Sequence, residues 1–203
     1  MNFLTRYFPS LNVFSLASTL YIGLGVAISF VLPLAAHAEE LSKLPSQLTS
    51  PIFVLNSLDA TISMVDPKTW TETKRIPTGK EPHHLYLTPD NKSFIVANAF
   101  GDSLTFIDPK TGDIQRTVRN ILDPYHLRFS PDMKWFVTAA NRLNHVDIYR
   151  WDGKDLTLAK RIPTSKTPSH LWIDSKSTVV YASMQDSNEL VAIDLATQTI
   201  KWR

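Results

Sequence analysis

One motif occurs three times in the chain, as Pro82-His83-His84-Leu85, Pro124-Tyr125-His126-Leu127 and Pro168-Ser169-His170-Leu171. Successive copies begin 42 and 44 residues apart. After each copy comes a short alternation of apolar and polar residues, which is typical of a β-strand buried on one face. Repetition at a nearly fixed spacing predicts an architecture that is built from copies of one structural unit.

Three further strand-like segments follow each copy of the motif. They are rich in β-branched and aromatic residues, and Pro, Asp and Gly separate them. Their apolar residues alternate with a period of two, so a helical repeat is excluded. The segments are 94–98, 103–108 and 114–118 in the first unit, 136–140, 145–149 and 156–162 in the second, and 179–183, 189–194 and 199–203 in the third.

Four short strands in every unit of about 40–45 residues are typical of a β-propeller blade. We therefore predict an all-β fold, a β-propeller made of four-stranded antiparallel blades. The blades are expected at approximately 51–80, 81–122, 123–166 and 167–203. A β-sandwich would use similar strands, but it would not require the same opening motif three times.

The first predicted blade is incomplete. Its segments 52–55, 61–65 and 70–76 correspond to the second, third and fourth strands of the other units, and no first strand precedes Ile52. Propellers commonly complete one blade with strands from both ends of the chain, because an open ring exposes strand edges. We therefore expect the chain to be the N-terminal part of a seven- or eight-bladed ring. A closed four-bladed ring is the alternative.

Residues 1–38 have the pattern of a secretory signal peptide. They contain one charged side chain, Arg6, then an apolar stretch at 20–35, and they end in the small residues of Ala36-His37-Ala38. We expect cleavage after Ala38 and a periplasmic or secreted protein without a stable membrane anchor. A permanent anchor is the alternative, although the stretch is short for a hydrocarbon core of about 30 Å. The polar residues 39–50 predict a linker.

The composition excludes several classes of site. The 203 residues contain no Cys, so a disulfide, a thiolate nucleophile and a covalently attached c-type haem are excluded. The formal net charge is +2, without the basic stripe that nucleic-acid binding leaves, so no nucleic-acid partner is expected. No Ser-His-Asp order, phosphate loop, paired-carboxylate motif or HExxH sequence occurs. No catalytic residue is assigned, and enzymatic activity stays open because propeller sites collect residues from many blades.

The predicted blades resemble the YVTN-type β-propeller repeat, whose usual form is P-x-G-[IL]-A-[VL]-S-P-D-G-K-x-[VL]-[YF]-V-A-N before a strand that ends I-D-x-x-T. The resemblance covers about 52–203. Matching residues in one unit are Pro82, Leu85, Leu87, Pro89, Asp90, Lys92, Ile95, Val96, Ala97, Asn98, Ile107, Asp108 and Thr111. Exported propellers of this kind are also similar to the cytochrome d1-type haem domain. The repeat implies the fold and leaves the activity open.

One departure from the usual repeat is consistent, because His84, His126 and His170 stand where that repeat has Gly. The opening strand of a propeller blade lines the central channel, so equivalent positions in successive blades lie around one ring. We therefore expect the three side chains to face a common cavity and to bind a cofactor or substrate. Imidazole is the commonest metal ligand in proteins and a usual axial ligand of haem.

Two other interpretations of these histidines stay open. Each imidazole could instead hydrogen-bond a neighbouring backbone carbonyl and pin the start of its strand. The three could also bind one metal ion directly, which needs nitrogens about 2.0–2.1 Å from the ion. Inner strands of adjacent blades are expected to lie too far apart for that, unless the rings lean together.

Other side chains near the motif are assigned by their position. Arg128 follows His126 by two residues and is expected on the same face of the strand, where it would pair a propionate or carboxylate. Alternation turns His83 away from His84, and His145 is expected at a surface or edge. The Asp residues that end third strands should cap the N–H groups of turns; they are Asp66, Asp108 and Asp194.

The predicted function is that of an exported YVTN/cytochrome d1-like propeller whose central channel binds a small molecule or redox cofactor. Haem is one candidate, and the cofactor and any metal stay unidentified at this point. One alternative is a non-catalytic scaffold whose blade loops bind another exported protein, which the lack of a catalytic motif favours. The other is a propeller lactonase or dehydrogenase. That activity would need acidic metal ligands in the channel, and the opening strands offer none.

Overall fold

The structure is a computed structural model that describes residues 50–203. The predicted signal peptide and all but the last residue of the predicted linker lie outside the described residues. Within 50–203 the chain forms fifteen strands and two short 3-10 turns. In this part of the chain no helix is long and apolar enough to cross a membrane.

The first two blades follow each other in the chain. Blade one has the strand order β1-β2-β3 and blade two the order β4-β5-β6-β7, and all neighbouring strands are antiparallel. Their bounds are β1 Ile52–Asn56, β2 Thr61–Val65, β3 Glu72–Pro77, β4 Pro82–Leu87, β5 Phe94–Asn98, β6 Ser103–Ile107 and β7 Ile114–Arg119. The 3-10 turn η1 (Ala99–Gly101) joins β5 to β6.

Blades three and four repeat the same arrangement, with the strand orders β8-β9-β10-β11 and β12-β13-β14-β15. Their bounds are β8 Pro124–Phe129, β9 Trp135–Ala140, β10 His145–Trp151, β11 Leu156–Pro163, β12 Pro168–Ile173, β13 Val179–Met184, β14 Glu189–Asp194 and β15 Thr199–Trp202. The 3-10 turn η2 (Gln185–Ser187) joins β13 to β14. The prediction of an all-β propeller with four-stranded antiparallel blades is confirmed, and blade one has three strands as its sequence indicated.

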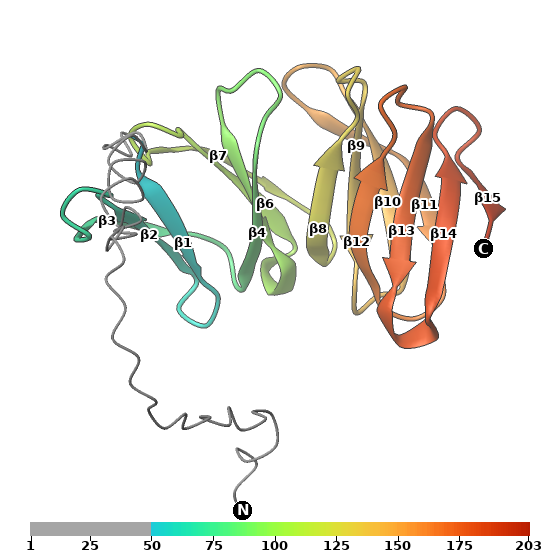
Figure 1. The fold of residues 1–203 in the computed structure, drawn as a ribbon, viewed down its shortest axis with the longest axis horizontal. Coiled ribbons are helices and arrows are strands. Elements are labelled where there is room, and N and C mark those ends of the chain that lie inside the picture. Colours follow the sequence, from blue (N-terminus) through green and yellow to red (C-terminus); the bar gives the residue numbers. More distant parts are fainter. Residues whose placement is uncertain (1–49) are drawn as a thin grey trace, which may run out of the picture. The chain divides into compact units, whose positions relative to one another are not determined.

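Figure 1 shows the four blades side by side in chain order, with β1 and β15 in the blades at opposite ends. The described residues do not close into a ring. Three hydrophobic cores lie between consecutive blades. One core joins Ile62 of blade one to Val96 and Ile107 of blade two. Blades two and three therefore contribute both of their faces to these cores, and blades one and four contribute one face each, which fixes the orientation of each blade against its neighbours.

The position of a strand within its blade decides its composition. Every residue of β9, a middle strand with the sequence Trp-Phe-Val-Thr-Ala-Ala, is buried because neighbouring blades cover both faces. The outer strand β7 (Ile-Gln-Arg-Thr-Val-Arg) is mostly exposed. Turn aspartates cap backbone N–H groups as predicted. Asp66 Oδ1 accepts from Lys68 N at 2.7 Å, and Asp108 Oδ1 accepts from Lys110 N at 2.7 Å.

The opening strands β4, β8 and β12, called the inner strands below, share an irregularity. In each, the register shifts between the proline and the histidine of the motif. Proline has no N–H to donate to the ladder, and the residue after it is the extra residue of a β-bulge. A bulge interrupts the alternation of side chains, so residues on either side of it no longer follow the period of two.

Candidate functional site

The structure brings His84, His126 and His170 together from three different blades. They occupy equivalent positions on the inner strands, and β8 contacts both β4 and β12 (Figure 1). The ring centroids of His84 and His126 are 4.7 Å apart, and those of His126 and His170 are 4.9 Å apart. One nitrogen from each ring lies within 4.8 Å of the others. The rings thus converge, but nitrogens that bind one ion lie about 3.3 Å from each other, so direct metal binding stays a prediction.

Both ring nitrogens of His126 have partners. Its side chain is 1% exposed. Leu171 N donates to His126 Nδ1 at 3.3 Å, so Nδ1 carries the lone pair. The proton is then on Nε2, which lies 3.0 Å from the Tyr86 hydroxyl and donates to it. His126 therefore links blade two to blade four through blade three, but its backbone partner is an N–H group and not the carbonyl that the pinning interpretation named.

His84 is partly buried and is held by one strong contact. Its Nδ1 donates to the carbonyl oxygen of Tyr125 at 2.6 Å. A carbonyl only accepts hydrogen bonds, so this contact places the proton on Nδ1 and leaves the lone pair on Nε2. His84 thus joins blade two to blade three, with one nitrogen still available.

His170 differs from the other two because it is exposed. Among the described residues, no hydrogen bond involves its ring nitrogens; only its backbone N–H donates, to Ser183 Oγ at 3.2 Å. Its centroid is 5.7 Å from that of His84. Both nitrogens of His170 are therefore available beside the two imidazoles whose tautomers are fixed.

Burial lowers the pKa values of two of these histidines. Burial, and after it the neighbouring His84 and Arg128, lowers the pKa of His126 to about 3. Burial is also the largest cause of the lowered pKa of His84, and the hydrogen bond to Tyr125 offsets it in part. Both imidazoles are therefore neutral at physiological pH, the form in which a ring nitrogen can bind a metal or accept a proton.

Arg128 lies next to the histidines and extends the site. Its guanidinium carbon is 4.0 Å from the centroid of the Tyr86 ring and 5.8 Å from that of Trp172. Trp172 is 65% exposed. Within residues 50–203, no carboxylate lies within ion-pair distance of Arg128, and its Nε makes a long contact of 3.4 Å with Leu171 O. The positive charge is therefore available to an anion.

We name these side chains the inner-strand cluster, and its members are His84, Tyr86, His126, Arg128, His170 and Trp172. A cavity of about 670 Å³ adjoins the cluster between the ends of β8 and β12. It is lined by Arg128, Phe129, Pro131, Trp172, Ile173, Asp174 and Ser175. The site thus combines imidazole, guanidinium and aromatic surface from three blades. Tyr86 and Trp172 stand two positions after the motif histidines, as Arg128 does, and this spacing in the sequence already indicates that they are its counterparts.

His83 does not point away from His84 as alternation predicted. Its Nδ1 is 3.0 Å from His84 Nδ1, and its ring centroid is 4.0 Å from that of Tyr125. The cause is the bulge, in which His83 is the extra residue. His83 therefore borders the cluster.

The prediction for His145 is also wrong, because this residue is 6% exposed rather than at a surface. It lies 3.5 Å from Asp147, which is fully buried. Arg161 donates to both oxygens of Asp147, at 2.8 and 2.7 Å, and the Tyr149 hydroxyl donates to it at 3.1 Å. Burial raises the pKa of Asp147, but the hydrogen bonds from Arg161 and the nearby His145 outweigh it, and the pKa is lowered. We call these four residues the blade-three network.

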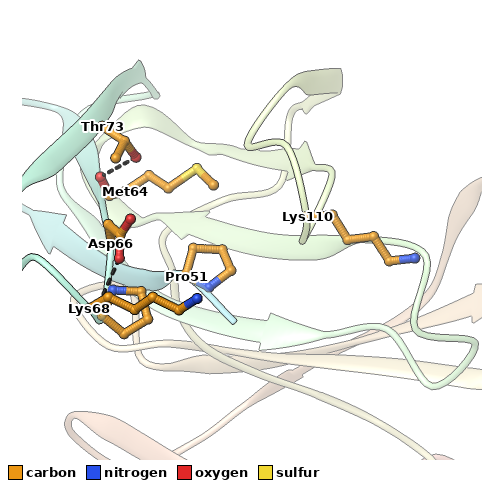
Figure 2. A pocket seen from close by; sticks show the side chains of 7 residues that line it. Pro51, Met64, Asp66, Lys68, Thr73 and Lys110 are labelled. Carbon is orange, nitrogen blue, oxygen red and sulfur yellow. Dashed lines mark hydrogen bonds between the residues drawn. The ribbon is translucent and has the colours of Figure 1, made fainter. Parts of the chain in front are cut away.

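A second hollow, of about 270 Å³, lies at the turns of blades one and two (Figure 2). Its labelled residues are Pro51, Met64, Asp66, Lys68, Thr73 and Lys110. The polar atoms are largely used within the turns, because Thr73 Oγ1 donates to Met64 O and Asp66 Oδ1 accepts from Lys68 N (Figure 2). This hollow is therefore a weaker candidate than the inner-strand cluster.

The fold and the site define a repeat β-propeller whose inner strands gather histidines from successive blades. The chain belongs to the YNCE-like beta-propeller family, whose model matches residues 11–203. A comparison with curated proteins gives no match.

Solved structures with the same fold include three proteins. Hydrazine synthase from Kuenenia stuttgartiensis is 20% identical, with a TM-score of 0.63 over 75% of this chain and 45% of that chain. A candidate 6-phosphogluconolactonase from Bacteroides uniformis is 16% identical, with a TM-score of 0.60 over 75% of this chain and 50% of that chain. The dihydro-heme d1 dehydrogenase NirN, in complex with DHE, is 20% identical, with a TM-score of 0.57 over 79% of this chain and 38% of that chain.

At these identities the likeness shows the fold alone. The chain spans half or less of the length of each of these structures. The family match, together with the NirN and hydrazine synthase structures, confirms the predicted resemblance to YVTN and cytochrome d1-like propellers.

Proposed function

We propose that this protein is an exported β-propeller whose inner-strand cluster binds a small anionic molecule or a redox cofactor, with a haem-type macrocycle as the cofactor that the residues fit best. One observation carries the proposal. An exposed imidazole without a ring hydrogen bond to the described residues, His170, belongs to the same cluster as an arginine without a carboxylate partner among them, Arg128. Both are held on packed strands, and the arginine borders a cavity of about 670 Å³.

The residues supply the three things that a haem requires. His170 would hold the haem iron, since no hydrogen bond to the described residues engages its ring nitrogens. Arg128 would pair the carboxylates, and Trp172 offers an exposed aromatic surface to the ring. A bound haem would supply electron transfer or ligand binding at its iron. The NirN structure, which is in complex with DHE, supports the choice of this ligand class as a probe.

Export is part of the proposal and depends on residues 1–38. One charged residue, an apolar stretch and the Ala36-His37-Ala38 end support a cleaved secretory signal. The mature protein would then work in an oxidising compartment, and a chain with no Cys is compatible with that environment.

Haemin titration of the purified, tag-free protein tests the binding proposal. We expect a Soret shift with one haemin per chain in the wild type. Replacement His170→Ala removes the imidazole that would hold the iron, and Arg128→Gln removes the charge that would pair the carboxylates, so each should weaken haemin binding by at least about tenfold. The matched control is Arg150→Gln, because Arg150 also packs over an aromatic ring, 4.5 Å from that of Trp135, but lies outside the cluster. Wild-type affinity in both cluster variants would contradict the proposal.

A further inference from the structure

The geometry points to a metal site: we propose that His84, His126 and His170 together bind one divalent late transition-metal ion, such as Zn²⁺ or Cu²⁺, with an open position for an anionic ligand. This proposal rests on the same histidines of the inner-strand cluster as the proposed function. It concerns a bare metal ion, however, and it can be tested separately from haem binding. It begins from the convergence of three imidazole nitrogens, all within 4.8 Å of one another.

The hydrogen bonds already present fix the tautomers of two of the three rings. A histidine that binds a metal usually donates its other N–H to a carbonyl, a carboxylate or water, which fixes its tautomer. His84 donates from Nδ1 to the Tyr125 carbonyl at 2.6 Å, which leaves Nε2 unprotonated. His126 donates from Nε2 to the Tyr86 hydroxyl at 3.0 Å, which leaves Nδ1 unprotonated. Each ring therefore presents one lone pair.

Two small adjustments would complete the site. Nitrogens bound at about 2.0–2.1 Å to one tetrahedral ion lie about 3.3 Å from each other, so the cluster has to contract. His170 can provide this movement, because it is exposed and no hydrogen bond to the described residues holds its ring. His126 would exchange its 3.3 Å contact with Leu171 N–H, which is long for a hydrogen bond, for the metal bond.

The donor set decides the class of metal. Three imidazoles with no carboxylate among them suit Zn²⁺, Cu²⁺ or Ni²⁺ and do not suit Mg²⁺ or Ca²⁺, which require oxygen ligands. Three protein ligands leave a fourth position open, as in catalytic rather than structural zinc sites. No acidic ligand neutralises the ion, and the Arg128 guanidinium is nearby. The open position would therefore take an anion that also pairs Arg128, such as a carboxylate.

Zinc titration of the purified, tag-free protein after removal of metal with EDTA tests the site. We expect calorimetry to show one Zn²⁺ per chain. Removal of a metal ligand should lower zinc affinity at least as much as removal of a hydrogen bond that supports such a ligand. His170→Ala and His84→Ala should therefore each weaken zinc binding by at least about tenfold. The matched control is Arg150→Gln, because Arg150 lies outside the cluster and packs over the ring of Trp135, and it should change affinity less than about twofold. His126 is left intact because its removal is expected to destabilise the fold.

The number of nitrogen ligands gives a second readout. Electron paramagnetic resonance of the Cu²⁺ form should show coupling to three imidazole nitrogens in the wild type and to two in His170→Ala. Absence of stoichiometric binding, or binding that both His84→Ala and His170→Ala leave unchanged, would overturn the proposal. Haemin binding without zinc binding would refute the metal site and leave the proposed function standing. Zinc binding without haemin binding would support the metal site and count against haem.

Discussion

Two regions of the structure use histidine and charge in opposite ways. The blade-three network is confined to one blade, and its buried carboxylate, Asp147, receives two hydrogen bonds from Arg161 and one from Tyr149. The inner-strand cluster draws its rings from three blades, contains no acidic residue and includes the exposed His170. A network whose buried carboxylate is paired within its own blade stabilises the fold. A cluster that leaves an imidazole and a guanidinium without partners can bind a ligand.

The largest expected effect concerns the blade-three network. Asp147→Asn removes the charge that Arg161 and Tyr149 contact, and it should lower the free energy of unfolding by about 3 kcal/mol. Urea denaturation of the two proteins measures the difference. The control is Asp194→Asn at a turn, where the ion pair with Lys201 is solvent-accessible and the loss should stay below about 1 kcal/mol. Equal losses in the two variants would show that the blade-three network has no special role.

The second prediction compares two histidines of the inner-strand cluster. His126→Ala leaves the Leu171 N–H without its acceptor and creates a cavity, so it should lower the free energy of unfolding by about 2 kcal/mol. His170→Ala removes an exposed ring and should change stability by less than about 0.5 kcal/mol. The same urea experiment measures both. If the two variants lose the same stability, the division into a pinning histidine and a binding histidine fails.

The smallest expected effect is a pH dependence. The pKa of Asp147 is lowered in the folded protein, so its contribution to stability is complete above the unfolded value of about 3.9 and is lost as the pH falls through the folded value. The difference in unfolding free energy between wild type and Asp147→Asn should therefore shrink below about pH 4, by at most about 1.4 kcal/mol per pH unit. Denaturation curves at several acidic pH values measure it. A difference that stays constant down to the lowest pH at which both proteins fold would contradict the prediction.

The fold was predictable because its signals are local. The Pro-x-His opening, the period of two and the turn aspartates each depend on residues a few positions apart, and Asp66 and Asp108 cap their turns as their positions indicated. The equivalence of His84, His126 and His170 was also predictable, since the same offset in each repeat gives the same place in each blade.

The contacts of the site were less predictable because they cross between blades. Tyr86 meets His126, and Leu171 meets the same ring from the other side, 40 and 45 residues away in the sequence. The distances of Tyr86 and Leu171 from the His126 ring depend on how the blades pack, which no local sequence pattern specifies. His145 was misplaced for a related reason: it lies on β10 between β9 and β11, where it pairs with Ala140 and Pro163. His83 was misplaced because simple alternation ignores the bulge.

The bulge at the start of each inner strand also has an evolutionary consequence. The register shift recurs at the Pro-x-His step of β4, β8 and β12, so the backbone turn that directs each imidazole is encoded inside the repeat itself. A unit copied by gene duplication would arrive with its histidine already directed at the shared cluster. Blade one, which has no such strand among the described residues, contributes no imidazole. In this architecture, lengthening the gene by one repeat and enlarging the site by one ligand would be the same genetic event.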